Sequence, residues 1–162
     1  MIDRYGLDAH RLIAVCPGAE FGPVKQWPLE KYASLVNELL VSGYQVVLLG
    51  SPNDVKDSEM IVQNISVSAK DALKNLTGKT SIPEVIDIIA LAQAAVTNDS
   101  GLMHVAAATG CSTIALFGPS SPLHTPPLSK KAVILESASG NMSDISVDDV
   151  FDALSNRIQL TV

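Results

Sequence analysis

The sequence has 162 residues, the length of one domain and enough to bury a hydrophobic core. Hydrophobic residues make up 47% of it and charged residues 17%, and its mean hydropathy is +0.27, so a disordered chain is excluded. The 11 Lys and Arg residues stand against 17 Asp and Glu residues, and the net charge is −6 without a basic cluster. Because a nucleic-acid-binding protein needs a basic surface, we expect no nucleic-acid partner.

Cysteines and hydrophobic runs limit the class further. Cys16 and Cys111 belong to no CxxC pair, which excludes a zinc ribbon and a thioredoxin-type redox site, and we expect both to be buried. No apolar stretch reaches the roughly 20 residues of a membrane span, and the first residues lack the apolar region of a signal peptide. We therefore expect a soluble, cytoplasmic protein that forms a single domain over residues 1–162.

Strand-like and helix-like segments alternate along the chain. Short apolar runs predict strands at 12–16, 45–49, 75–77, 94–97, 113–117 and 132–135. Apolar residues at helical spacing, with caps such as Ser81 and Ser146, predict helices at 29–40, 54–65, 82–91, 100–109 and 147–158. The continuous apolar runs are typical of parallel strands that are buried on both faces. The alternation predicts an α/β fold with a doubly wound, mostly parallel, Rossmann-like sheet.

The loop after the first predicted strand, 17–28, is one candidate binding segment, because ligands of such sheets bind beyond the carboxyl ends of the strands. The loop contains two glycines, Lys25 and a Trp-Pro pair, but no GxGxxG dinucleotide motif. Lys25 could reach a phosphate group, or it could be an ordinary solvated lysine. The pattern leaves both interpretations open.

The segment 97–104, a strand end that turns into a helix, is a second candidate. Free N–H groups in the first turn and the helix dipole would attract an anion, and Gly101 would let a diphosphate approach the backbone. The alternative is a helix start that Asp99 or Ser100 simply caps. Ser100 and His104 could share a helix face, but the segment does not fit GxSxG, so a nucleophilic serine is not expected.

Three other patterns indicate less about function. The proline-rich segment 117–128 predicts a rigid rim rather than a mobile lid. The run from Thr77 to Thr80 is not a Walker A motif, because Leu73 stands where that motif needs glycine. The histidines at 10, 104 and 124 lie far apart in the sequence without carboxylate pairing, so no metal site is expected.

Three motifs occur in a specific order: Pro17-Gly-Ala-Glu-Phe-Gly-Pro-Val-Lys-Gln-Trp-Pro28, Asn98-Asp-Ser-Gly-Leu-Met-His-Val-Ala-Ala-Ala108 and Gly118-Pro-Ser-Ser-Pro…Thr-Pro-Pro-Leu128. Over about residues 12–135 the chain resembles the lipopolysaccharide heptosyltransferase family, glycosyltransferase family 9. The resemblance implies a GT-B architecture, in which two Rossmann-like domains enclose the substrate cleft. This sequence resembles the C-terminal, donor-binding half. The family transfers heptose from ADP-heptose to the lipopolysaccharide inner core, with inversion and without an obligatory metal or a cofactor.

The resemblance also implies roles for individual residues. Lys25 matches the family lysine that contacts the donor phosphates, and Asp99 opens a segment that lies at the diphosphate and the sugar. Asp54 stands where an acidic residue often meets the adenosine ribose. The implied donor site comprises Gly18, Ala19, Lys25, Asp54, Asp99, Ser100, Gly101, Leu102, Met103 and His104. Two departures are Gln26, where the most similar branch of the family usually has arginine, and a shorter segment after Leu135.

Partners and location follow from the same resemblance. The donor would be ADP-L-glycero-D-manno-heptose. The lipopolysaccharide acceptor, and any peripheral contact with the cytoplasmic face of the inner membrane, would involve the N-terminal domain, which is absent from this sequence. That domain carries the proposed Asp base, so no catalytic residue is expected in this chain. Helix amides and Lys25 would stabilise the departing ADP, and we expect a chain that binds nucleotide without transferring heptose.

Two other functions fit parts of the pattern. A stand-alone nucleotide or sugar-nucleotide binding module would show similar motifs without catalysis. Another GT-B enzyme, such as a sugar-nucleotide epimerase, would need an acid/base set of carboxylates, and the sequence does not reveal one. A further upstream domain of ordinary size in the source gene would favour the transferase over the module.

Overall fold

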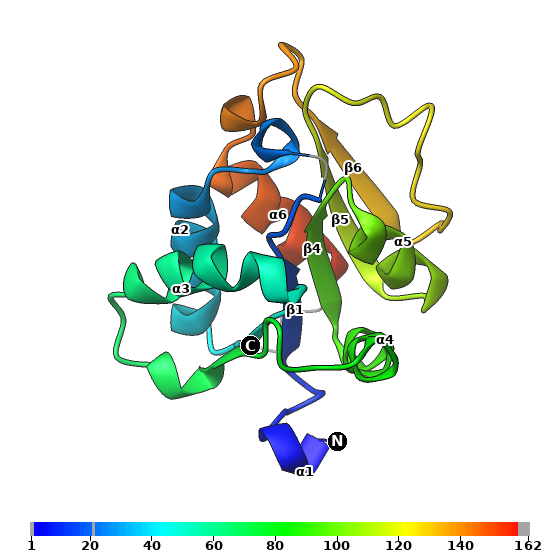
Figure 1. Cartoon of the computed structure of the whole chain (residues 1–162). Coiled ribbons are helices and arrows are strands. Elements are labelled where there is room, and N and C mark those ends of the chain that lie inside the picture. The colour runs from blue at the N-terminus through cyan, green and yellow to red at the C-terminus, as the bar shows by residue number, and fades with distance from the viewer. Residues whose placement is uncertain (1, 21, 159–162) are drawn as a thin grey trace.

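A computed structural model describes residues 2–20 and 22–158 of the chain. Within these residues, six parallel strands form one sheet in the order β3-β2-β1-β4-β5-β6, with helices on both faces (Figure 1). The strands are β1 (Leu12–Cys16), β2 (Gln45–Leu48), β3 (Leu73–Asn75), β4 (Ala94–Asn98), β5 (Ser112–Phe117) and β6 (Ala132–Glu136). The predicted doubly wound, parallel α/β sheet is confirmed.

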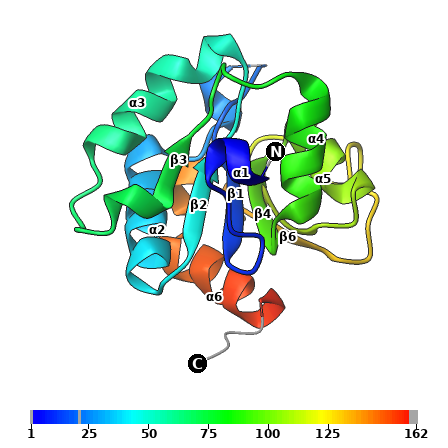
Figure 2. The same ribbon diagram turned by 90° about the horizontal axis from the view of Figure 1, so that it is seen from below.

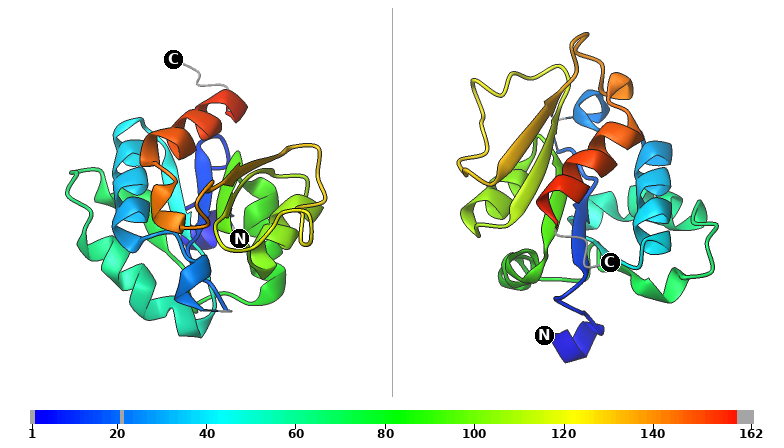
Figure 3. Two further views of the ribbon diagram at one scale, coloured as in Figure 1. Left: turned by 90° about the horizontal axis from the view of Figure 1, so that it is seen from above. Right: turned by 180° about the vertical axis from the view of Figure 1, so that it is seen from behind.

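Helices connect the strands and cover the sheet. In the described part of the chain they are α1 (Ile2–Tyr5), α2 (Leu29–Val41), α3 (Val55–Gln63), α4 (Ile82–Leu91), α5 (Gly101–Ala108) and α6 (Val147–Arg157). On one face α2 contacts both α3 and α6, and α4 and α5 lie together on the opposite face (Figures 2 and 3). No helix among these is long and apolar enough to cross a membrane.

The sheet separates two hydrophobic cores. In β1, Ile13 and Val15 face the core under α2, α3 and α6, whereas Leu12 and Ala14 face the core under α4 and α5. Successive side chains of a strand point to opposite faces, so β1 is buried on both. Full burial of one aliphatic side chain of this size contributes about 1.5–3 kcal/mol. The predicted two-sided burial is confirmed for β1, β2 and β4, whose residues are all buried.

The two edge strands depart from the prediction. β3 begins at Leu73, two residues before the predicted segment, and pairs with β2 up to Asn75. Its three residues are half-buried, and β6 has no fully buried residue. An edge strand has a neighbour on one side only, so it needs no continuous apolar run. The apolar pattern that located the central strands was therefore weak at β3.

Side-chain caps begin α4 and α6, as the sequence predicts. The Glu84 carboxylate accepts hydrogen bonds from the Ser81 N–H at 2.8 Å and the Ser81 hydroxyl at 2.9 Å, which with the return bond forms a capping box. The Ser146 hydroxyl accepts from the Asp149 N–H at 3.0 Å. Helical elements of three or four residues were not predicted, because they leave no periodic signal. They are α1 and the 3₁₀ turns Pro23–Lys25, Pro52–Asp54, Lys70–Ala72 and Met142–Asp144.

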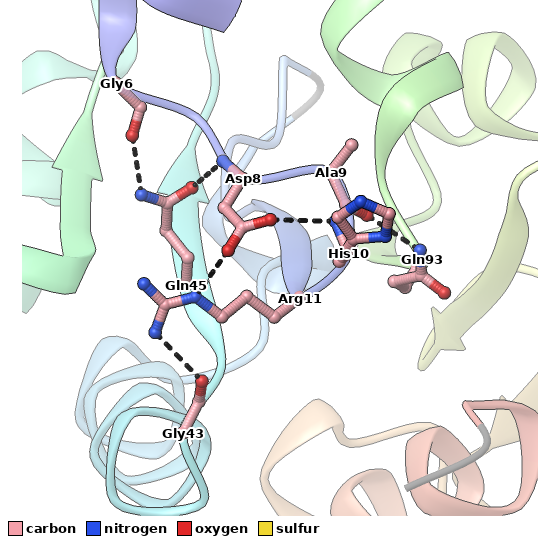
Figure 4. A network of polar contacts seen from close by, with 8 residues as sticks. All are labelled: Gly6, Asp8, Ala9, His10, Arg11, Gly43, Gln45 and Gln93. Atoms are coloured by element: carbon pink, nitrogen blue, oxygen red, sulfur yellow. Dashed lines mark hydrogen bonds and ion pairs between the residues drawn. The ribbon is translucent and has the colours of Figure 1, made fainter. Parts of the chain in front are cut away.

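A polar network ties the segment before β1 to the amino-terminal edge of the sheet (Figure 4). The buried side chain of Gln45, the first residue of β2, accepts from the Asp8 N–H at 2.7 Å and donates to the Gly6 carbonyl at 2.8 Å. Gln93, just before β4, donates to the Ala9 carbonyl at 2.7 Å. These contacts join the entering segment to the starts of two strands, while the loops that follow β1 and β4 lie at the opposite edge.

Candidate functional site

A cavity of about 480 Å³ opens at the carboxyl edge of the sheet. Its lining includes Cys16 at the end of β1 and Ser100 just after β4, the two strands between which the strand order reverses. Ligands of doubly wound sheets bind at this reversal, because the connections from the two strands run to opposite faces and leave a crevice. The cavity is therefore the candidate ligand site.

The cavity lining divides into an apolar and a polar part. The loops after β1 and β2 and the start of α5 provide polar residues and backbone: Gly18, Ala19, Glu20, Ser51, Asp54, Ser100 and Gly101. Helices α4 and α5 provide the apolar wall: Ile82, Val85, Ile86, Leu102 and Val105. Ile82 is 75% exposed and Ile86 39% exposed, although Val85 beside them is buried. A cavity with an apolar wall and a polar end is typical of sites for ligands that have both an apolar and a polar part.

Cys16 lies at the inner end of the cavity. Burial raises the pKa of its thiol to about 12, so the thiol is neutral at physiological pH. Burial also raises the pKa of Cys111, to about 11. Both cysteines are buried, as the sequence predicts, and neither has the low pKa of a reactive thiol.

The Asp54 carboxylate is fixed in the wall of the cavity. Its Oδ2 accepts from the Ser51 N–H at 2.7 Å and from the Ser51 hydroxyl at 2.8 Å. Two glycines make room for it, because a Cβ on Gly18 or Gly50 would lie within 3 Å of the Asp54 side chain. Oδ1 accepts no hydrogen bond from residues 2–20 or 22–158, so it remains able to accept one from a ligand hydroxyl.

The loop after β1 is anchored at several points. The Gln26 amide donates to the Pro17 carbonyl at 2.9 Å and to Asp57 Oδ2 at 3.0 Å, which joins the loop to α3. Trp27 is fully buried, and its indole N–H donates to the Ile145 carbonyl at 2.9 Å. These bonds hold the end of the loop, at Gln26 and Trp27, against α3 and the segment that precedes α6. Gln26, where the resemblance would place arginine, acts here as an anchor of the loop.

Lys25 and Asp99 lie together beside the cavity. Lys25 Nζ is 3.4 Å from Asp99 Oδ2, and the hydroxyl of Thr125 donates to the same carboxylate at 3.3 Å. Asp99 is only 7% exposed. Burial strengthens the attraction between the two charges, so Asp99 holds the lysine next to the start of α5. Thr125 belongs to the long loop between β5 and β6, which reaches back over this edge.

The start of α5 has no side-chain cap. The Ser100 side chain makes no capping hydrogen bond, and the carboxylate of Asp99 is engaged by Lys25 and Thr125 instead. The interpretation in which Asp99 or Ser100 caps this helix is therefore wrong. The N–H groups of Gly101 and Leu102 bond to none of the described residues. These N–H groups and the helix dipole favour an anion at this end of the cavity.

The structure brings most of the predicted site residues together, but not all. Those that line the cavity are Gly18, Ala19, Asp54, Ser100, Gly101 and Leu102. Lys25 and Asp99 pair beside it. Met103 is different, since its side chain is fully buried against Ala115 and Phe117 and helps to hold α5 on the sheet. A ligand contact from that side chain is therefore excluded. His104 is exposed on α5 and is not part of the lining.

Sequence reasoning missed two groups of site residues. The first group is the apolar wall on α4. This helix is apolar on nearly all sides, and an apolar helix face that stays exposed indicates a binding surface, so a signal was present in the sequence. The other is Asn98, a fully buried amide at the end of β4 that bonds to both ends of the loop after β1. An amide at the end of a mostly apolar strand was the available signal for Asn98.

The strand order and the cavity at its reversal define a Rossmann-like α/β domain. Residues 4–154 match glycosyltransferase family 9 (heptosyltransferase), and the chain belongs to this family. It is 47% identical, over 85% of its length, to lipooligosaccharide heptosyltransferase 2 of Haemophilus influenzae, and 45% identical, also over 85%, to lipopolysaccharide heptosyltransferase 2 of Escherichia coli. The structure of E. coli ADP-heptose LPS heptosyltransferase II matches with a TM-score of 0.90 at 42% identity over 96% of this chain.

The matches cover only part of those proteins. The chain spans 40% of the length of the two curated relatives and 49% of the E. coli structure. The structural match confirms the expectation that the fold corresponds to one half of a GT-B protein. Within residues 2–20 and 22–158, no three His, Cys, Asp or Glu side chains gather where they could hold a metal ion.

Proposed function

We propose that this chain is the donor-binding part of a heptosyltransferase, which binds ADP-heptose for inverting transfer of the heptose to the lipopolysaccharide inner core. The observation that carries the proposal is that one cavity joins an apolar wall to the uncapped start of α5. A nucleoside diphosphate sugar needs both, since its base is flat and weakly polar while its diphosphate is anionic. Membership of the family, and the name of the similar E. coli structure, support ADP-heptose as the sugar nucleotide.

The geometry suggests how the donor would lie. The adenine would pack against the apolar wall at Ile82 and Ile86, with its ribose hydroxyls near the Asp54 carboxylate. The diphosphate would then reach the Gly101 and Leu102 N–H groups, close to the Lys25 ammonium. This order places the polar parts of the donor along the polar part of the lining.

The site would supply stabilisation of the leaving group. As the glycosidic bond to ADP breaks, negative charge grows on the diphosphate, and preorganised N–H donors and Lys25 would stabilise it in the transition state. A base must still take the proton of the acceptor hydroxyl. Asp99 is engaged by Lys25 and Thr125, and the available oxygen of Asp54 is assigned above to the ribose hydroxyls, so we assign that step to neither. We therefore expect the base, and the acceptor site, to come from outside this chain, which binds the donor without transferring heptose.

A stand-alone nucleotide-binding module is the second candidate, because an apolar wall and an uncapped helix start suit a nucleotide whether or not transfer follows. Calorimetric titration with ADP, UDP and ADP-heptose separates the two. The donor-binding proposal predicts that ADP binds more tightly than UDP and that ADP-heptose binds more tightly than ADP, since the sugar adds contacts. Equal affinity for ADP and ADP-heptose would favour the module. Release of ADP and heptosylated acceptor by this chain alone would contradict the expectation that its base lies elsewhere.

A further inference from the structure

We infer that Asn98 is a positioning residue of the donor site, which closes the loop after β1 into its binding shape. The inference rests on the proposed function, because the loop carries Gly18 and Lys25. Asn98 is fully buried at the end of β4 and does not line the cavity. It therefore acts on a ligand only through the loop that it holds.

All four hydrogen-bonding positions of the Asn98 amide are used. Its Oδ1 accepts from the Trp27 N–H at 3.1 Å and from the Tyr32 hydroxyl at 2.7 Å. Its Nδ2 donates to the Pro17 carbonyl at 2.9 Å and to the Gly18 carbonyl at 3.1 Å. A carboxamide offers two donor hydrogens and two acceptor lone pairs, so this site satisfies it completely.

These four bonds connect the two ends of one loop. Pro17 and Gly18 leave β1, and Trp27 leads into α2, so one side chain brings the start and the end of the loop together. The buried rings of Trp27 and Tyr32 meet edge to face, with centroids 5.0 Å apart, and close the amide off from solvent. A buried, fully satisfied network has one arrangement of low energy, because any other arrangement would leave a buried polar group without a hydrogen bond. Gly18 at the cavity and Lys25 next to Asp99 are positioned as a consequence.

The substitution Asn98→Asp tests this role, since it keeps the size of the side chain and exchanges the two N–H donors for oxygen. As a carboxylate, the new group faces the carbonyls of Pro17 and Gly18 without a hydrogen to donate. Once protonated, it donates one bond to that pair. Burial and the facing carbonyls would raise the pKa of the introduced carboxyl. The loop should therefore be displaced at neutral pH and partly restored as the pH falls.

Trp27 provides a spectroscopic readout, because it is the one tryptophan of the sequence and contacts Asn98 directly. We expect Asn98→Asp to change the Trp27 emission at neutral pH and to weaken ADP binding by about tenfold, the equivalent of one well-formed hydrogen bond. Both effects should diminish together on acidification. If Asn98→Asp does not fold, Tyr32→Phe replaces it as the test. This variant keeps the ring and removes one donor to Asn98 Oδ1, and it should show smaller changes in Trp27 emission and in ADP affinity.

Gln45→Glu is the matched control. Gln45 is a buried amide that also accepts from one N–H and donates to one carbonyl, but at the opposite edge of the sheet (Figure 4). This variant should lose stability without changing the Trp27 emission of the folded chain or its affinity for ADP. A purely structural role for Asn98 would leave the ADP affinity of folded Asn98→Asp unchanged, as in the control.

The outcomes distinguish the loop-closing role of Asn98 from the proposed donor-binding function. The inference is overturned if folded Asn98→Asp binds ADP within about twofold of the wild type at neutral pH, with unchanged Trp27 emission. It is supported if emission and affinity titrate together in Asn98→Asp and not in Gln45→Glu. If the wild type itself binds no ADP while the Trp27 emission of Asn98→Asp still titrates, the loop-closing role is supported and the proposed function fails.

Discussion

The Asp54 carboxylate occupies the space that a side chain on Gly18 would need. A Cβ at Gly18 would lie 2.7 Å from both Cγ and Oδ1 of Asp54, and one at Gly50 would lie 2.9 Å from Oδ2. The loops after β1 and β2 can therefore approach this carboxylate only because both have glycine there. Together with Ser51, these residues form one wall of the cavity, so the two loops depend on each other.

The substitution Gly18→Ala should disturb that wall. The added methyl would overlap Asp54, and relief requires a shift of the loop or of the carboxylate away from Ser51. We expect a loss of about 1–3 kcal/mol in the free energy of unfolding, typical of overpacking, together with weaker binding of ADP. Urea unfolding and calorimetry on the same preparation would measure both. Unchanged stability would show that the wall adapts without cost.

The substitution Gly101→Ala should weaken ADP binding without a loss of stability. A Cβ at this position meets no atom within 4 Å, and Gly101 is the first residue of α5. Stability should be unchanged or slightly higher, because alanine restricts the unfolded chain. The methyl would nevertheless stand where we propose that the diphosphate approaches, so ADP affinity should fall by about tenfold. Unchanged affinity with intact folding would place the diphosphate elsewhere.

The substitution Lys25→Ala should weaken ADP binding, and it should also lower stability, because it leaves the buried Asp99 carboxylate without the lysine charge. A charged hydrogen bond to phosphate is worth about 1.5–3 kcal/mol. We expect the ADP dissociation constant to rise by about tenfold or more. Lys70→Ala, which removes the same charge from an exposed site away from the cavity, is the control. An equal loss in both variants would indicate a general effect of charge.

Part of the acid sensitivity of the fold should come from Glu84. Hydrogen bonds from the Ser81 N–H, the Ser81 hydroxyl and the Tyr5 hydroxyl lower the pKa of this carboxyl below its ordinary value of 4.5. Its contribution is therefore complete above that value and is lost as the pH falls through the lower, folded-state pKa. Glu84→Gln retains a capping side chain that does not titrate. Urea unfolding between about pH 7 and about pH 3 should show a shallower loss of stability for Glu84→Gln than for the wild type. Parallel profiles would assign the acid sensitivity to other carboxyls.

Both cysteines should resist thiol reagents in the folded chain. Burial raises the pKa of Cys16 to about 12 and that of Cys111 to about 11, so the reactive thiolate is scarce at about pH 8. A disulfide exchange reagent such as DTNB should react slowly with the native chain and should titrate both thiols in urea. Rapid reaction of one thiol in the native chain would show that the structure around that thiol opens readily.

Local sequence patterns determined the central part of this fold. The apolar run of β1 from Leu12 to Cys16 and the capping box at Ser81 could be recognised because burial and helix capping act over a few neighbouring residues. Three ordered motifs identified the family, and the resemblance that they carry named six of the residues that line the cavity. The edge strand β3 was displaced because a half-buried strand leaves little hydrophobic signal. The domain extent, the cytoplasmic location and the donor roles of the individual residues stay predictions.

The sequence by itself determined the class of fold, the family and the two segments after β1 and β4 that contribute to the site, but not the wall on α4. Only the tertiary structure decided how those segments act together: that Asp99 holds Lys25 instead of capping α5, that Met103 points into the core, and that Asn98 joins both ends of one loop. The physical reason is distance along the chain. A cap or an amphipathic helix depends on residues a few positions apart, whereas Asn98 and Pro17 are 81 positions apart. Such partners meet only once the strands have paired and the cores have packed.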